Sequence, residues 1–220
     1  MNTVQNFVSP SKYNIKCPYP MTPEFIVVHN TANDASARNE IAYMIRNNNQ
    51  VSFHYAVDDK EIVQGIPENR NAWHAGDGAN GPGNRKGIAV EICYSKSGGQ
   101  RFIEAEKLAA KFIAYKLKEK GWGIDRVKKH QDFSGKYCPH RTLDMGWQRF
   151  LDMVQSELNA LKGADKVGED KTQPSAWAKE AWEWAKKEGI TDGTRPKDTM
   201  TREEMVTMLY RYHCVRILFS

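Results

Sequence analysis

The sequence has no apolar run long enough to cross a bilayer, which takes about 20 consecutive residues. We therefore expect no insertion into a membrane. The first twenty residues include Pro10, Lys12, Lys16 and Pro18 and contain no apolar core, so we also expect no signal peptide. Such a protein accumulates in the cytoplasm of the cell that makes it, and work outside the membrane needs another route of release.

Cysteine and charge of one sign are also scarce. The four cysteines are widely spaced, and in a chain without a secretion signal they predict no disulfide framework. Lysine and arginine number 32 and aspartate and glutamate 27, giving a net charge of +5. Because basic and acidic residues are interspersed, we expect no nucleic-acid partner. Hydrophobic residues make up 40% of the 220 residues, enough for one packed domain and a small appendage.

The pattern of apolar residues over 1–163 predicts an α/β domain, a sheet with helices packed against it. Strands are expected at 25–29, 52–57, 61–63, 87–93 and 124–130, and helices at 34–48, 103–120 and 143–161. On the helix at 34–48, Ile41, Ala42 and Ile45 form the expected apolar face. A long loop rich in Gly and Asn covers residues 67–84, and loops of that length in compact domains usually carry function.

The carboxy-terminal part has a different organisation. Residues 164–174 are polar and without periodicity and end at Pro174, which predicts a linker. Residues 175–220 predict a small helical module. One helix covers about 175–188, a tight turn follows at Asp192-Gly193, and a second helix opens with the capping box Thr201 to Glu204. About 45 residues make a thin core, so we expect this module to dock on the first domain or to form a homodimer.

Three residues have side chains that suit a metal ion. His29 ends the apolar run at 25–28, and His130 and Cys138 flank a turn that contains Ser134-Gly135. Two imidazoles and a thiolate suit Zn²⁺ and leave a fourth position open for water, as in hydrolytic zinc sites. Either histidine alone would more often be an ordinary hydrogen-bonded residue. The combination favours a zinc site.

Glu91 and Lys136 are the candidate catalytic residues. Glu91 lies in the otherwise apolar strand at 87–93, where a carboxylate is costly unless it is paired or has a chemical task. Near a zinc site it could act as general base, and Lys136, two residues before Cys138, could stabilise an oxyanion. The alternatives are an ion pair of Glu91 with Arg85 or Lys86 and an exposed loop lysine.

The other histidines and a loop tryptophan are open to two interpretations. Trp73 and His74, in the long loop, could bind a sugar or peptide, although a loop tryptophan can equally fill the core. His54 is expected to be held by hydrogen bonds in its strand. His140 follows Pro139, which directs the chain away from the metal ligands.

Four separated motifs occur together in this sequence: 27–32 (VVHNTA), 73–76 (WHAG), 87–92 (GIAVEI) and 130–139 (HQDFSGKYCP). In this order they resemble the zinc-dependent N-acetylmuramoyl-L-alanine amidases of phage endolysins, relatives of peptidoglycan recognition proteins. The resemblance covers about residues 20–160. It implies a central, mainly mixed sheet flanked by helices.

The resemblance also implies roles for individual residues. His29, His130 and Cys138 would hold Zn²⁺, with Glu91 and Lys136 as the catalytic pair. Asn30, Thr31, Trp73 and His74 would bind the substrate, peptidoglycan. The bond cleaved would join N-acetylmuramic acid to L-alanine of the stem peptide. The enzyme would be made in the host cytoplasm, reach the wall after release and lyse a Gram-positive host. Some relatives have a tyrosine where this chain has Phe53, so proton handling would fall to Glu91.

The segment 177–211 resembles a single S-layer-homology repeat, through the motifs at 177–181, 184–185, 189–193 and 201–211. Such repeats are associated with attachment to cell walls, and several usually act together. Two other functions remain open for the protein. One is a non-catalytic peptidoglycan-binding module on the same scaffold, although relatives of that kind lack the cysteine at the position of Cys138. The other is a regulator that binds another protein.

Overall fold

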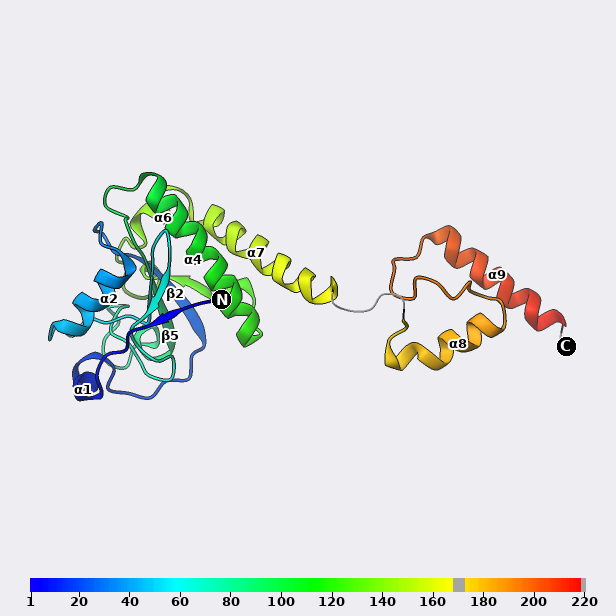
Figure 1. Ribbon diagram of the computed structural model, residues 1–220, viewed down its shortest axis with the longest axis horizontal. Helices are drawn as coiled ribbons and strands as arrows, with labels where there is room; N and C mark the ends of the chain where they lie inside the picture. Colours follow the sequence, from blue (N-terminus) through cyan, green and yellow to red (C-terminus); the bar gives the residue numbers. More distant parts are fainter. Residues whose placement is uncertain (168–172, 219–220) are drawn as a thin grey trace. The chain divides into compact units, whose positions relative to one another are not determined.

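The computed structural model describes residues 1–167 and 173–218. The chain divides into two compact units, Met1–Lys162 and Gly163–Ser220, called here the amino-terminal and the carboxy-terminal unit (Figure 1). In the described part of the chain, no helix has the length and apolar character that crossing a membrane requires.

A six-stranded mixed sheet forms the centre of the amino-terminal unit. Its strand order is β1-β4-β3-β5-β2-β6. The strands are β1 (Val4–Gln5), β2 (Phe25–Asn30), β3 (Tyr55–Val57), β4 (Ile62–Gln64), β5 (Gly87–Ile92) and β6 (Val127–Lys129). Only β3 and β4 are antiparallel, and the other neighbours are parallel. The predicted fold class, a mainly mixed sheet flanked by helices, is confirmed.

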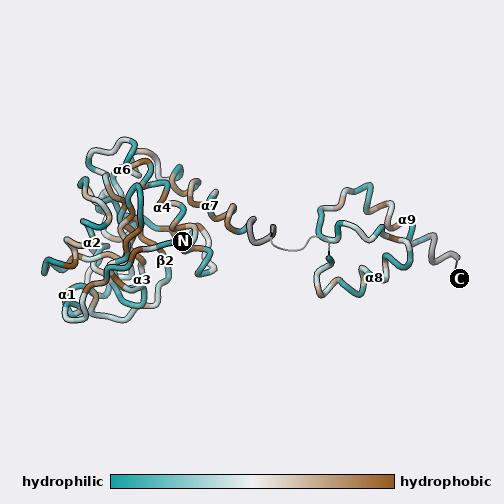
Figure 2. Tube along the Cα trace, viewed as in Figure 1, coloured by the Kyte–Doolittle hydropathy of each residue, from teal (hydrophilic) through white to brown (hydrophobic). Residues whose placement is uncertain are grey.

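The helices cover both faces of this sheet, so the central strands have to be apolar on both sides. In Figure 1, α2 (Ala37–Arg46) lies on one side of the strands and α4 (Gly99–Lys120) and α7 (Trp147–Val167) lie on the other. The strands β2 and β5 are accordingly buried along nearly their whole length. In Figure 2 the tube is brown through the middle of the unit, where the strands lie.

Short helical segments connect the main elements. They are η1 (Pro10–Lys12), α1 (Tyr13–Lys16), α3 (Pro82–Lys86), η2 (Ile124–Arg126), α5 (Gln131–Ser134) and α6 (His140–Asp144). Gly121 ends α4 in the left-handed conformation, with φ of 67°. This conformation favours glycine, and the end of the helix falls where the sequence predicts it.

The structure corrects several predicted elements. Ala42 is exposed, and the buried face of α2 is formed by Ala37, Ile41 and Met44. A small residue such as alanine is compatible with either face. The expected strand at 124–130 is a 3-10 turn followed by the short strand β6, and α3 shortens the predicted loop. The strand β1 has only two residues, too few for a periodic signal.

The carboxy-terminal unit contains η3 (Ala176–Ala178), α8 (Lys179–Lys187) and α9 (Arg202–Leu218). The predicted capping box is present: Thr201 Oγ1 accepts from the Glu204 amide at 3.1 Å, and Glu204 Oε2 accepts from the Thr201 amide at 2.8 Å. Asp192 Oδ1 accepts from the Thr194 amide, which closes the predicted turn. The predicted linker at 164–174 is partly wrong, because α7 continues through Val167 on helix-forming alanine and lysine residues. Its middle, 168–172, lies outside the described residues.

Candidate metal centre and active site

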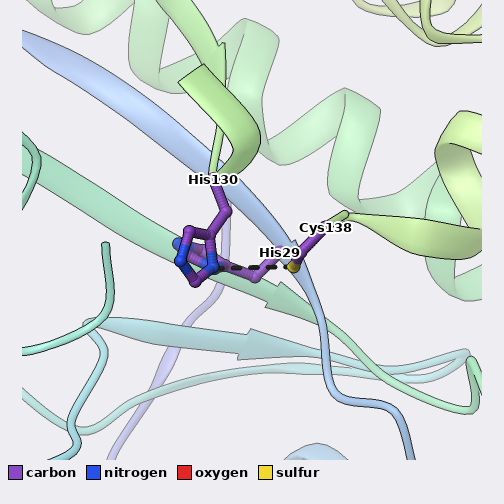
Figure 3. A group of neighbouring side chains, drawn as sticks. All are labelled: His29, His130 and Cys138. Atoms are coloured by element: carbon purple, nitrogen blue, oxygen red, sulfur yellow. Dashed lines mark hydrogen bonds between the residues drawn. The ribbon is translucent and has the colours of Figure 1, made fainter. Parts of the chain in front are cut away.

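The three expected metal ligands come from one edge of the sheet. His29 lies near the carboxyl end of β2, His130 directly follows β6, and Cys138 lies just before α6. Since β2 pairs in parallel with β6, their carboxyl ends meet at the same edge. Figure 3 shows the side chains of His29, His130 and Cys138 pointing toward one another.

The distances between the donor atoms fit one small cation. His29 Nδ1 and His130 Nδ1 are 3.0 Å apart, and Cys138 Sγ is 3.9 Å from His29 Nδ1. All three donor atoms lie within 4.8 Å of one another. Tetrahedral zinc with ordinary bond lengths separates two nitrogens by about 3.3 Å and a nitrogen from a sulfur by about 3.6 Å. Small side-chain shifts would bring the three donors into that geometry.

The chemistry of these donors also fits a cation. A single proton between the two ring nitrogens can serve only one of them as donor, whereas a metal ion would engage both lone pairs. Burial and the nearby charge of Glu91 raise the pKa of the Cys138 thiol to about 11. A thiol in such surroundings becomes a thiolate when a positive charge lies beside it, and a bound metal would supply that charge.

Glu91 lies beside this group. Residues His29 and Glu91 are direct partners in the β2–β5 register, so their side chains leave the same face of the sheet. Glu91 Oε1 is 4.0 Å from His29 Nδ1, and Oε2 is buried without a hydrogen bond from any described residue. Burial in the first place, and then the charge of Glu40, raise the pKa of Glu91 to about 8, against the opposing effect of Lys136. A carboxyl group with these properties is suited to accept and return a proton.

A cavity of about 650 Å³ opens in front of these groups. Glu91, Lys136 and Cys138 line it together with Thr31 and Trp73. A second hollow of about 680 Å³ runs along α2 and shares Thr31, Val51, Phe53 and Glu91 with the first. Lys136 is exposed and lines the same cavity. Burial lowers the pKa of both His29 and His130, and the charge of Lys136 lowers both further.

Comparison with known proteins agrees with this geometry. Residues 19–141, more than half of the chain, match the N-acetylmuramoyl-L-alanine amidase family, Amidase_2. The chain belongs to this family of amide hydrolases. The match contains all of the predicted metal ligands and the catalytic pair.

Individual relatives show how far the similarity extends. The chain is 54% identical over 215 residues to the N-acetylmuramoyl-L-alanine amidase CwlA of Bacillus subtilis, which covers 96% of this chain and 78% of CwlA. It is 62% identical over 164 residues to the amidase XlyB of the same organism, over 74% of this chain and about half (52%) of XlyB. Among solved structures, PlyL matches with a TM-score of 0.69 and 56% identity, over 71% of this chain and 99% of PlyL.

Within the amidase, the structure gives Asn30 a supporting position. Its side chain is buried, and Oδ1 accepts hydrogen bonds from the backbone amides of Arg141 at 2.9 Å and Thr142 at 3.2 Å. These amides belong to the first turn of α6, whose own N-cap residue, Pro139, has no side-chain oxygen to accept them. Asn30, in β2, therefore caps α6 and links the segment that carries Cys138 to the strand that carries His29. The sequence predicts instead that Asn30 contacts the substrate.

Trp73 and His74 are also more buried than a substrate-gripping loop suggests. The Trp73 indole is 9% exposed, and its Nε1 donates to the Ile15 carbonyl at 3.0 Å. His74 Nδ1 is 3.0 Å from His29 Nε2, behind the metal-facing side of that ring. Direct contact of Asn30, Thr31, Trp73 and His74 with substrate stays a prediction, and all four residues line the cavity.

Two supporting residues in the long loop were not predicted from the sequence. Asn84 is buried, and its Oδ1 accepts from the amides of His74 and Ala75, both at 2.8 Å. Asp77 accepts from the amides of Gly83 and Asn84, which hold α3 against the loop. The abundance of Gly and Asn in this segment was the only available hint.

The remaining histidines of the amino-terminal unit are not part of the ligand group. His54 accepts from the Ala89 amide through Nδ1, and its Nε2 lies 2.9 Å from the Arg70 carbonyl, so the expectation of a hydrogen-bonded strand histidine is confirmed. His140 Nε2 lies 3.3 Å from the Ser95 carbonyl. Among the described residues, His29, His130 and Cys138 are the one group of three donors that could hold a metal.

Proposed function

We propose that this amidase is zinc-dependent and is an endolysin that cleaves the amide bond between N-acetylmuramic acid and L-alanine of peptidoglycan, thereby lysing a Gram-positive host. The family supports the reaction class. The solved structure of a mutant endolysin from Bacillus subtilis is 39% identical to the chain, with a TM-score of 0.64. The enzyme is made in the host cytoplasm and acts on the wall after release.

One observation carries this proposal: two imidazoles and a thiol converge beside a carboxyl group at the floor of an open cavity. Zinc bound by His29, His130 and Cys138 would supply Lewis-acid polarisation of the scissile carbonyl and activation of a water molecule. With a thiolate among its ligands, the site would carry a net charge of +1 instead of +2.

The side chains around this group perform the remaining steps. Glu91 takes a proton from the attacking water and passes it to the leaving L-alanine nitrogen, because this residue lines the cavity beside His29 and its Oε2 has no hydrogen-bond partner among the described residues. The exposed Lys136 ammonium stabilises the negative charge that develops on the carbonyl oxygen. Phe53 lines the same cavity and has no hydroxyl, so it takes no part in proton transfer.

Metal analysis and product identification on matched variants test this function. Wild type should bind one zinc and release new L-alanine amino groups from purified walls. Cys138→Ser should lose zinc, and Glu91→Gln should keep zinc and fold but lose cleavage. Glu104→Gln, an exposed carboxylate of α4, is the control and should behave as wild type. The role of Glu91 would be contradicted if Glu91→Gln bound zinc and cleaved walls at the normal rate. If wild type bound walls without cleaving them, the non-catalytic binding module would be favoured.

We also propose that the carboxy-terminal unit attaches the enzyme to the cell wall as an S-layer-homology-like repeat. The similarity to CwlA covers 96% of the chain and so reaches into this unit. Trp177 is 89% exposed, a suitable stacking surface for wall carbohydrate. In the full chain, Trp177→Ala should reduce sedimentation with purified walls while leaving cleavage of a soluble fragment unchanged. Sedimentation equal to wild type would argue against this contact. The homodimer expected through this unit stays a prediction, which equilibrium sedimentation of the full chain would test.

A further inference from the structure

The two expected ligand imidazoles are contacted from behind by the same short loop, residues 73–76. We propose that His74 is a positioning residue, which fixes the tautomer and the ring orientation of His29 so that Nδ1 faces the metal position. This inference rests on the zinc site proposed above. It assigns His74 a role that acts through the His29 ring, separate from the substrate contact predicted for this residue.

The hydrogen-bond partners of His29 determine its tautomer. Its Nδ1 faces His130 Nδ1 and Cys138 Sγ, so this nitrogen must keep its lone pair free to bind a metal. The ring proton then lies on Nε2, where His74 Nδ1 is the acceptor at 3.0 Å. A ligand histidine almost always donates its other nitrogen to a polar group, commonly a carboxylate or a carbonyl. In this chain the acceptor is a second imidazole.

His74 can serve as acceptor only with its own proton on Nε2. Nε2 of His74 is buried without a hydrogen-bond partner among the described residues, and Nδ1 faces His29 Nε2 at 3.0 Å. Nδ1 is therefore the nitrogen placed to accept the His29 proton. The two rings meet edge to face, with centroids 5.0 Å apart.

The same loop also faces the second imidazole, and the Ala75 carbonyl lies near the His130 ring. A Cβ atom at Gly76 would lie 3.6 Å from His130 Nε2, so this nitrogen is the one that faces the loop. Both ligand histidines thus direct Nδ1 toward the metal position and Nε2 toward the loop at 73–76.

The loop is itself rigidly held. Asn84 Oδ1 accepts from the amides of both His74 and Ala75, and Asn84 Nδ2 donates to the Gly78 carbonyl at 3.0 Å. A Cβ atom at Gly83 would lie 2.5 Å from the Ala75 Cβ, so α3 approaches the loop as closely as a glycine allows. The acceptor on His74 is therefore in place before any metal binds, and a loaded site gains affinity from this preorganisation.

A pair of substitutions separates the acceptor from the bulk of the side chain. His74→Asn places an amide oxygen close to the position of Nδ1, and His74→Leu fills similar space with a methyl group. Zinc affinity, measured in competition with a chromophoric chelator, should fall by about 10–100-fold in His74→Leu and stay close to wild type in His74→Asn. Leu158→Ala in α7 is the control, because it removes a buried side chain that lines neither cavity. It should lower stability without changing zinc affinity.

A spectroscopic measurement distinguishes positioning from general destabilisation. In zinc-loaded wild type and His74→Asn, nitrogen NMR should show a slowly exchanging proton on His29 Nε2, and in His74→Leu this proton should exchange rapidly or be lost. Equal zinc affinity and equal proton exchange in His74→Leu and wild type would overturn the inference while leaving the zinc site intact. Wild type that binds no zinc would overturn the zinc site and, with it, this inference.

Discussion

Replacing Asn30 by alanine should weaken both the fold and the metal centre, because one side chain supports the two. Its Oδ1 is the acceptor for two amides of α6, and Nδ2 lies 3.2 Å from the His29 carbonyl and 3.4 Å from Thr142 Oγ1. In Asn30→Ala the amides of Arg141 and Thr142 lose their acceptor. Thr142 is completely buried, so water cannot replace the lost oxygen there.

The expected magnitude follows from these contacts. A buried donor left without a partner costs about 1–3 kcal/mol, and loss of a helix cap costs about 1 kcal/mol. We therefore expect Asn30→Ala to lower the free energy of unfolding of the metal-free protein by about 3 kcal/mol. The domain should remain folded, since typical domains are stable by about 5–15 kcal/mol. Zinc affinity should fall as well, because α6 begins two residues after Cys138.

Urea unfolding in the presence of a chelator measures the first effect, and zinc competition the second. Ser36→Ala removes the cap of α2, whose Oγ accepts from the Asn39 amide at 3.4 Å, and provides a matched control. It should cost less stability and leave zinc affinity unchanged. A free energy of unfolding for Asn30→Ala within about 0.5 kcal/mol of wild type would refute the reasoning, since an exposed substitution has an effect of that size.

Three other substitutions should have distinct effects. Burial alone would raise the pKa of Glu68, but hydrogen bonds from Lys120 and Lys116 lower it to about 2. This value is below the unfolded pKa of about 4.3, so the ion pairs stabilise the fold by about 3 kcal/mol above about pH 4.3. That stabilisation is lost as the pH falls toward 2. In Glu68→Gln, the free energy of unfolding should therefore depend less on pH over this interval than in wild type. Lys16→Met removes a fully buried ammonium that donates to the loop at 47–51, so stability should fall by about 2–3 kcal/mol. KM should rise, because Val51 of this loop lines the cavity. An unchanged KM would show that the loop does not contact substrate. Lys136→Gln should lower kcat by about 10²–10³-fold with zinc binding and stability unchanged. The kinetics of wall cleavage measure this effect, and a smaller decrease in kcat would contradict the role of Lys136.

The elements that the sequence predicts well are those whose apolar pattern is long and continuous. The strands β2 and β5 are nearly uninterrupted apolar runs because helices cover both sides of the sheet, and α4 ends at a glycine in the left-handed conformation. The face of α2 was less well predicted, since Ala42 is small enough for either environment and Met44 was not considered. The two-residue strand β1 exists only through its parallel pairing with β4, a contact between segments about 60 residues apart that no local pattern contains.

In the candidate site, the metal donors could be predicted from the sequence, whereas the supporting residues could not. Metal donors are restricted to a few residue types, so His29, His130 and Cys138 could be proposed before their distances were known. A supporting residue needs only a hydrogen-bonding atom in the right place, and many residue types provide one. The bond between Asn30 and Thr142 spans 112 positions in the sequence, and nothing near either residue indicates it.

The arrangement of donors and supports explains why the ligands come from separate elements. His29 is fixed by the sheet, whereas Cys138 belongs to a loop whose position depends on the capping of α6 by Asn30. Asn30 directly follows the ligand His29 in β2, so the side chain that orients the cysteine and the ring that shares its metal are adjacent in one strand. A displacement of β2 therefore moves the histidine and the cysteine together and preserves the distance between their donor atoms. For this reason substitutions in the core beneath β2 should lower stability more than zinc affinity, whereas Asn30→Ala should lower both.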